Sequence, residues 1–274
     1  MATIEKNGNS FYYEVHGQGE PVVLAHGLGG NHATWFKQVA TLAKAYKVIT
    51  FDHRGFGNST DNENIGRAGF VSDLKALLDH LDIEKAALVG QSMGGGTVIS
   101  FACQYPERVS GLVIADSLHA IVEEGEVAAL MNKAREATKD LSQLDRVLGK
   151  AFREANPSEA VLYQQINSFN ATDRSNLVGT YAENKYTAQQ LAAVGVPTMF
   201  VAGQDDILFP IDAIRAVQEQ VEGSFIVEFD ACGHSAFFEK PIEFNDTVLS
   251  FLQMCGLEPV SDKALSNSAG YEKV

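Results

Sequence analysis

The sequence predicts an α/β protein built on a mostly parallel sheet with helices on both faces. Short apolar runs alternate with segments of helical spacing in the first and last parts of the chain. These runs are apolar throughout, which is typical of parallel strands buried on both faces. Between residues 117 and 190, helical patterns occur without a convincing strand. A helical cap inserted into the α/β core is therefore expected there.

The chain before the cap begins with a predicted hairpin. Asn7-Gly8 is a strong two-residue turn signal, and residues 4–15 around it suit strands. Apolar runs of strand length follow at 21–25, 47–51, 86–89 and 109–115. Amphipathic spacing predicts helices over 35–45 and 70–81, and a further helix is expected over 97–104.

The alternation resumes after the cap. Strands are predicted over 197–203 and 225–229, and helices over 211–221 and 241–255, where Pro241 suits the first helical turn. The residues after 256 are polar and weakly patterned, which is typical of a loose terminus. The predicted organisation is a core in two parts, 1–116 and 191–256, a helical cap over 117–190 and a C-terminal tail over 257–274.

The composition of the chain limits which binding partners and which cellular compartment are expected. The net charge of −14 over 274 residues argues against binding nucleic acid or an anionic membrane through bulk charge. No stretch approaches the length of a membrane span, and the first eight residues lack the apolar core of a signal peptide. The three scattered cysteines, Cys103, Cys232 and Cys255, are expected to be free thiols in a reducing cytoplasm. Nothing in the sequence indicates the oligomeric state.

The stretch Gly90-Gln91-Ser92-Met93-Gly94 has the nucleophile-elbow pattern, Gly-x-Ser-x-Gly between a strand and a helix. Such a tight turn strains the backbone of the serine, and Gly90 and Gly94 leave room for neighbouring segments to approach. The same pattern also suits a glycine-rich turn with a passive serine. The motifs in the rest of the chain favour the nucleophile.

Those motifs occur in the order found in α/β-hydrolases, which this chain resembles over residues 4–255 apart from the cap. They are His26-Gly27 after an early strand, Asp52-His53-Arg54-Gly55-Phe56-Gly57-Asn58-Ser59 after the next, the elbow, Gly203-Gln204-Asp205-Asp206-Ile207-Leu208-Phe209-Pro210, and Gly233-His234. The resemblance implies a Ser-acid-His triad in that chain order. Ser92 is the expected nucleophile and His234 the expected base, because serine needs an adjacent base to react at neutral pH.

The acid of the triad is expected in the loop after the strand that ends near residue 203. The family pattern places it four residues before a proline, which favours Asp206 over Asp205. Asp116, at the end of another strand, is a third candidate. The acid orients the histidine and stabilises its imidazolium form.

The resemblance also implies an oxyanion hole and a substrate pocket. The two oxyanion donors are expected to be the backbone N–H groups of Leu28 and Met93. Gly27, Trp35 and His119 are the candidate substrate-binding residues, although Trp35 also suits packing of a helix against the core. Arg54 is interpreted as a structural residue of its turn.

The expected function is that of a serine hydrolase that cleaves a small carboxylic ester or lactone through an acyl-enzyme. Elbows reading Ser-Met-Gly-Gly also occur in hydrolases of carbon–carbon bonds in diketones or ring-cleavage products, but residues 26–30 lack the Gly-Pro-Gly typical of that group. Enol-lactone hydrolysis, perhydrolase activity and a ligand receptor that retains the triad are further alternatives. No cofactor or metal is expected, because the sequence has neither metal-ligand spacing nor a nucleotide-binding fingerprint.

Overall fold

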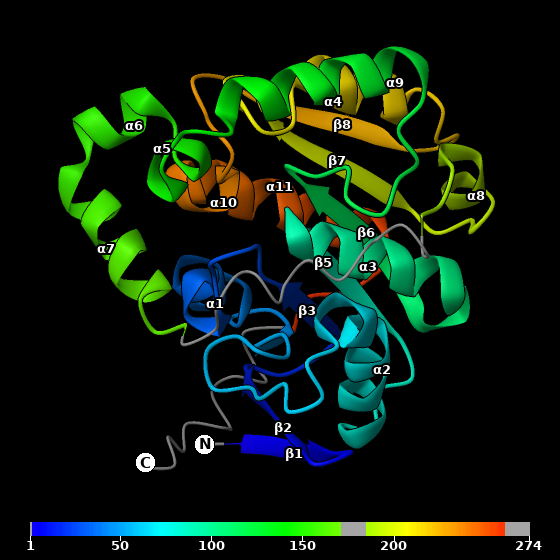
Figure 1. The fold of residues 1–274 in the computed structure, drawn as a ribbon. Coiled ribbons are helices and arrows are strands. Elements are labelled where there is room, and N and C mark those ends of the chain that lie inside the picture. Colours follow the sequence, from blue (N-terminus) through cyan, green and yellow to red (C-terminus); the bar gives the residue numbers. More distant parts are fainter. Residues whose placement is uncertain (1, 171–184, 261–274) are drawn as a thin grey trace.

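The computed structural model describes residues 2–170 and 185–260. Its eight-stranded sheet has the order β1-β2-β4-β3-β5-β6-β7-β8 (Figure 1). β2 is antiparallel to both neighbours, and the other adjacent strands are parallel. The strands are β1 (Ala2–Lys6), β2 (Asn9–His16), β3 (Pro21–Ala25), β4 (Lys47–Phe51), β5 (Ala86–Gln91), β6 (Val109–Ala115), β7 (Thr198–Gly203) and β8 (Phe225–Phe229). The predicted α/β-hydrolase architecture is confirmed.

Two hydrophobic clusters cover the two faces of the sheet. Successive residues of a strand point to opposite faces, so Val22 and Leu24 of β3 join one cluster while Val23 and Ala25 join the other. The Val22 cluster contains residues of α1 (Phe36–Leu42), α10 (Ala236–Glu239) and α11 (Pro241–Met254). The Val23 cluster contains residues of α2 (Phe70–His80), α3 (Met93–Gln104), α8 (Ala188–Ala192) and α9 (Ile211–Gln218). Burial on both faces explains the uninterrupted apolar runs of the central strands.

The segment between β6 and β7 is helical where the structure describes it. It contains α4 (Gly125–Thr138), α5 (Gln143–Val147), α6 (Lys150–Ala155) and α7 (Pro157–Asn167). α4 packs against α9, and its Val127 and Met131 belong to the cluster on that face of the sheet. α5, α6 and α7 form an arc outside the sheet, beside α10 and α1 (Figure 1). Residues 171–184 of the predicted cap lie outside the described residues, and the cap boundaries stay a prediction.

The structure differs from the sequence predictions at several helix ends. The helix expected to begin at Thr97 begins at Met93, directly after Ser92. Short 3₁₀ helices, η1 (His32–Trp35) and η2 (Gly66–Gly69), precede α1 and α2. Leu257, in the predicted tail, is buried, and its carbonyl accepts a hydrogen bond from the Tyr46 hydroxyl at 3.1 Å. Residues 261–274 of that tail lie outside the described residues.

Candidate active site

Ser92 occupies a strained turn between β5 and α3. Its backbone has φ 49° and ψ −114°, a left-handed conformation that a residue with a side chain rarely adopts. The backbone N–H of Ser92 donates to the carbonyl of Ala115 at 3.0 Å, and its own carbonyl accepts from the Ser117 hydroxyl at 2.7 Å. These bonds from the end of β6 hold the turn in place.

The glycines of the elbow are required by close packing, as the sequence predicted. A Cβ on Gly94 would lie 2.1 Å from the carbonyl oxygen of Ala25, and a Cβ on Gly90 would lie 2.5 Å from that of Gly94. Both contacts are shorter than non-bonded atoms allow. α3 can therefore pack directly against the end of β3, which brings the residues after β3 beside Ser92.

His234 and Asp206 form a buried pair in the loops after β8 and β7. The Nδ1 of His234 lies 2.9 Å from the Oδ2 of Asp206. The Oδ1 of Asp206 accepts hydrogen bonds from the backbone N–H groups of Leu208 at 2.7 Å and Phe209 at 3.1 Å. Because a carboxylate can only accept, Nδ1 carries the proton and Nε2 of His234 is left as an acceptor. This is the tautomer that a general base requires.

The environment of His234 favours its protonated form. Burial alone lowers the pKa of His234, but the charge and hydrogen bond of Asp206 raise that pKa above its ordinary value. The ring of Phe209 stacks on the imidazole at a centroid distance of 5.6 Å. His234 is therefore fixed in orientation and can take up a proton readily.

The other two candidate acids do not contact the imidazole through a hydrogen bond in the described part of the chain. Asp205 is exposed. Asp116 is fully buried, and its two oxygens accept from the N–H groups of Gly203 at 2.9 Å and Ala236 at 3.1 Å. Burial, with the nearby charge of Asp206, holds the pKa of Asp116 well above its usual range. The structure thus brings Asp206, and not Asp205, to His234.

Ser92 and His234 line the same cavity, which has a volume of about 230 Å³. Its apolar wall consists of Leu28, Met131, Val147, Tyr163, Leu208 and Phe209. Met131, Val147 and Tyr163 belong to helices between β6 and β7, so these helices help to enclose the site. A cavity of this size lies below the usual range of ligand pockets, roughly 300–1,000 Å³, and suits a small substrate.

The predicted oxyanion residues lie beside Ser92. Leu28 lines the cavity, and Met93 is the first residue of α3. Backbone N–H groups at a helix N-terminus favour negative charge. A Cβ on Gly27 would lie 3.2 Å from the Cβ of Ser92 and 2.1 Å from the Oε1 of Gln91, so a larger residue here would displace the Gln91 side chain. Gly27 itself is not among the described residues that line the cavity.

The two remaining substrate-binding candidates have different positions. His119 lines the cavity, and its ring meets that of Phe209 edge-on at 5.0 Å. Trp35 is fully buried in the core, where it packs against Phe237 at 4.5 Å and Phe244 at 6.3 Å between ring centroids. Trp35 is not among the described residues that line the cavity. Its position corrects the expectation of substrate binding and agrees with the alternative, packing of a helix against the core.

The chain matches the profile of the alpha/beta hydrolase fold family over residues 20–148 and 135–241. The chain belongs to this family. The sequence-predicted motifs and the elbow geometry are therefore those of an α/β hydrolase.

Curated relatives of this α/β hydrolase are hydrolases with different named substrates. A protein of Azorhizobium caulinodans, provisionally named carbamate hydrolase RutD, is 29% identical over 259 residues, covering 89% of this chain and 94% of the relative. The 2-hydroxy-6-oxononadienedioate/2-hydroxy-6-oxononatrienedioate hydrolase of Escherichia coli O81 is 30% identical over 269 residues, covering 86% and 88%.

Solved structures confirm the fold. An esterase from Thermogutta terrifontis matches with a TM-score of 0.77 and 24% identity, covering 92% of this chain and 97% of the esterase. The enol-lactonase from Burkholderia xenovorans LB400 matches with the same TM-score and identity, covering 92% of this chain and all of the lactonase. At this identity the likeness concerns the fold alone.

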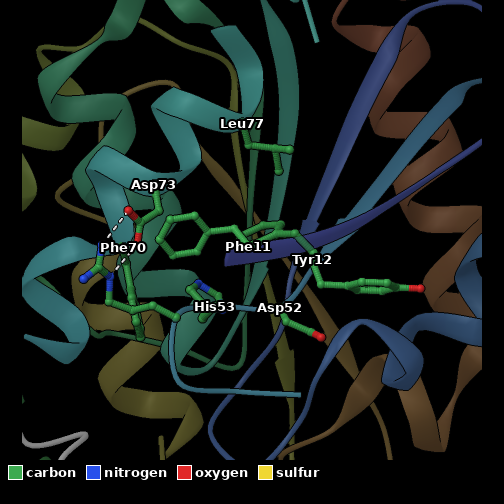
Figure 2. Close-up of a pocket in the computed structure, with 9 residues that line it drawn as sticks. Phe11, Tyr12, Asp52, His53, Phe70, Asp73 and Leu77 are labelled. Carbon is green, nitrogen blue, oxygen red and sulfur yellow. Dashed lines mark hydrogen bonds and ion pairs between the residues drawn. The ribbon is translucent and has the colours of Figure 1, made fainter. Parts of the chain in front are cut away.

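Arg54 of the α/β hydrolase has a structural role, as the sequence predicted. Its guanidinium binds both oxygens of Asp73, at 2.6 Å from Nε and 2.8 Å from Nη2 (Figure 2). The guanidinium also lies 5.3 Å from the ring centroid of Phe11. Phe11 and Asp73 lie beside Phe70 and Leu77 around a pocket in Figure 2. The volume of this pocket is about 10 Å³, which is too small for a substrate. Arg54 joins α2 to the turn after β4 and does not line the Ser92 cavity.

His26 shapes the loop after β3. Its Nδ1–H donates to the carbonyl of Gly27 at 2.9 Å, and its Nε2 accepts from the backbone N–H of His53 at 3.0 Å. Burial lowers the pKa of His26 to about 4, so the ring stays neutral at pH 7 and keeps this bonding pattern. The histidine fixes the loop that leads to Leu28.

Two buried polar residues that the sequence analysis missed hold the His234 loop. Gln91, directly before Ser92, donates through Nε2 to the carbonyl of His234 at 2.9 Å. The carboxylate of Glu239 accepts from the N–H of Gly233 at 2.9 Å and of Ser235 at 3.4 Å, on either side of His234. It also accepts from Gly149 at 3.0 Å, between α5 and α6. The bond of Gln91 to His234 and the bond of Gly149 to Glu239 span 143 and 90 positions of the chain, and no local pattern marks them.

Proposed function

We propose that this α/β hydrolase is a serine hydrolase that cleaves a small carboxylic ester or lactone through an acyl-enzyme intermediate. The observation that supports this most strongly is the joint position of Ser92 and His234. Both line one small cavity, while a buried carboxylate, Asp206, holds His234 in the tautomer of a general base.

In the proposed mechanism, Nε2 of His234 takes the proton of the Ser92 hydroxyl as its oxygen attacks the substrate carbonyl. The oxyanion that forms is stabilised by the backbone N–H groups of Leu28 and Met93. His234 then protonates the leaving oxygen, and the acyl group remains on Ser92. A water molecule, activated by His234, attacks the acyl-enzyme and releases the acid. Asp206 stabilises the imidazolium in both halves of the reaction.

The strain at Ser92 and the surrounding walls support this chemistry. A backbone held in a rare conformation persists only where its surroundings fix it, and such residues cluster at functional sites. The apolar wall, which includes Val147 of α5 and Tyr163 of α7, excludes water from the reacting groups. The same helices would select the substrate by length and shape.

Hydrolysis of a carbon–carbon bond is the second candidate function. It is supported by the relative of 30% identity that is named as a hydrolase of 2-hydroxy-6-oxo dienedioates. Against it, residues 26–30 read His-Gly-Leu-Gly-Gly and lack the Gly-Pro-Gly typical of such enzymes. The ester or lactone reaction therefore agrees better with the loop beside Ser92.

A turnover screen separates the two candidates. The protein and its Ser92→Ala variant are compared on p-nitrophenyl acetate and butyrate, on γ- and δ-lactones, and on a 2-hydroxy-6-oxo dienoate. We expect multiple turnovers of the esters or lactones that disappear in Ser92→Ala. Faster turnover of the dienoate would favour carbon–carbon hydrolysis, and turnover that survives in Ser92→Ala would contradict both candidates.

We further propose that the enzyme works in the cytoplasm, because Cys103, Cys232 and Cys255 are all free thiols. Within the described residues, no helix has both the length and the apolar character that crossing a bilayer requires.

A further inference from the structure

Arginine side chains reach the Ser92 cavity from three separate elements. Arg67 belongs to η2, Arg135 to α4 and Arg146 to α5. In the described ranges, the residues that line the cavity include no aspartate or glutamate. The cavity wall is therefore cationic, although the whole chain has a net charge of −14.

Arg146 differs from its neighbours Arg135 and Arg153 in its partners. Arg135 pairs with Glu123, and Arg153 of α6 pairs with Asp145 at 2.5 Å. The side chain of Arg146 forms no salt bridge within residues 2–170 and 185–260, and its buried Nε has no hydrogen-bond partner there. A buried donor without an acceptor is costly. Because Arg146 lines the cavity, an anion bound there would supply the partner that its guanidinium lacks in the described residues.

The helix that bears Arg146 is held in place on both sides of the site. Gln143, Arg146 and Val147 are spaced three and four residues apart, so they share one face of α5, and all three line the cavity. Gln143 donates to the carbonyl of Leu28 at 3.2 Å, and the carbonyl of Val147 accepts from the Ser235 hydroxyl at 2.7 Å. The face that presents Arg146 is thus fixed relative to Leu28 and the His234 loop.

The electrostatic environment of His119 agrees with a cationic cavity. Burial, followed by the charges of Arg67, His234 and Arg135, holds the pKa of His119 well below its ordinary value. The burial contribution disfavours any charge, whereas the contributions of Arg67 and Arg135 specifically oppose a further positive charge at this wall.

We propose that Arg146 binds a carboxylate of the substrate, so that the natural substrate is an acyl compound with a second, anionic group. This inference rests on the proposed function, because it names the substrate class of the same site. A guanidinium offers parallel N–H donors that match the two oxygens of a carboxylate, and the side chain of Arg146 lines the cavity. The carbonyl that reacts lies at Ser92, and the carboxylate lies at Arg146.

Binding to a protein that cannot turn over tests the inference directly. The probes are the monomethyl esters of succinate, glutarate and adipate, each compared with the dimethyl ester of the same acid by calorimetry on the Ser92→Ala protein. We expect at least one monomethyl ester to bind about tenfold or more tightly than its neutral counterpart. Adding Arg146→Gln should remove this preference, and adding Arg146→Lys, which keeps the charge, should retain part of it.

The matched control is Arg215→Gln in the Ser92→Ala background. Arg215 lies on α9, pairs with Glu228 at 2.7 Å and does not line the cavity. This variant should keep the preference for the anionic probe. Thermal melting of each variant verifies that it is folded.

The outcomes separate this inference from the proposed function. The inference is overturned if no monomethyl ester is preferred, or if the preference survives Arg146→Gln. The proposed function is tested separately, by Ser92-dependent hydrolysis in the otherwise unaltered protein. Hydrolysis without an Arg146-dependent preference rejects the inference alone, whereas the preference without hydrolysis rejects the serine hydrolase and supports the anion site.

Discussion

The Nδ1 of His234 lies 2.9 Å from the Oδ2 of Asp206, although the two residues are 28 positions apart in the chain. The other oxygen of Asp206 is held by two backbone N–H groups of its own loop. The carboxylate is therefore oriented before it meets the imidazole. This pair fixes the tautomer of His234, and the proposed role of His234 as the base depends on it.

Asp206→Asn should damage catalysis far more than Asp205→Asn. An amide cannot stabilise the imidazolium and can hold His234 in the wrong tautomer; the comparable change in a serine protease lowers kcat by about 10⁴. Asp205 is exposed, so its substitution should change kcat only a few-fold. The measurement is kcat on one activated ester, with thermal melts of both variants. A dead Asp205→Asn beside an active Asp206→Asn would reject the assignment of the acid.

The pH dependence of kcat/KM should reflect the raised pKa of His234. The base must be neutral to act, so activity falls as the pH drops through the pKa of the imidazole. Because Asp206 raises that pKa, the acid limb of the profile should lie above the ordinary histidine value of about 6.5. In Asp206→Asn, the residual activity should show an acid limb at lower pH. An acid limb in the same place for both proteins would contradict this account.

Leu28→Pro should remove one donor of the proposed oxyanion hole, because proline has no backbone N–H. The loss of one such donor lowers the rate roughly 10²–10³-fold. Leu28→Ala keeps the N–H and should cost much less, which makes it the matched control. Circular dichroism verifies that the proline variant is folded. Equal kcat values for the two folded variants would show that the donor lies elsewhere.

Glu239→Gln should lower both kcat and the melting temperature. The carboxylate accepts hydrogen bonds from Gly233, Ser235 and Gly149, and an amide nitrogen would oppose at least one of these donors. Leaving a buried donor unpaired costs about 1–3 kcal/mol. Because Glu239 positions the loop and does not touch the substrate, kcat should fall with little change in KM. The control is Glu243→Gln on the exposed part of α11, which should leave kcat and the melting temperature at the parent values. Identical behaviour of the two variants would refute the role of Glu239.

The strands of the sheet, and the site residues that directly follow them, can be predicted from the sequence because the patterns that mark both are local in the chain. An apolar run followed by Gly-x-Ser-x-Gly places Ser92, and two glycines mark where α3 approaches β3. The start of α3 was missed because Gly94, Gly95 and Gly96 are poor helix formers. Tertiary packing overrides that propensity, since a Cβ on Gly94 would clash with the carbonyl of Ala25.

The residues that support the site were not predictable, because their partners are distant in the chain. Gln91 and the carbonyl that it binds are 143 positions apart, and Gly149 and Glu239 are 90 apart. The role of Arg146 was not predictable for a similar reason. Its spacing fits any exposed helix face, and only the fold shows that this face lines the cavity. Trp35 is the opposite case. Its position near the predicted pocket suggested substrate binding, but the fold buries this aromatic residue in the core.

Covalent labelling of the nucleophile tests the central claim most directly. The intact protein is treated with a fluorophosphonate, and the modified residue is located by peptide mass spectrometry, with the Ser92→Ala variant as the control. The account predicts one phosphonate per chain, located on Ser92, and neither labelling nor ester turnover in Ser92→Ala. Labelling of a different serine in the folded protein, or turnover that persists in Ser92→Ala, would contradict it.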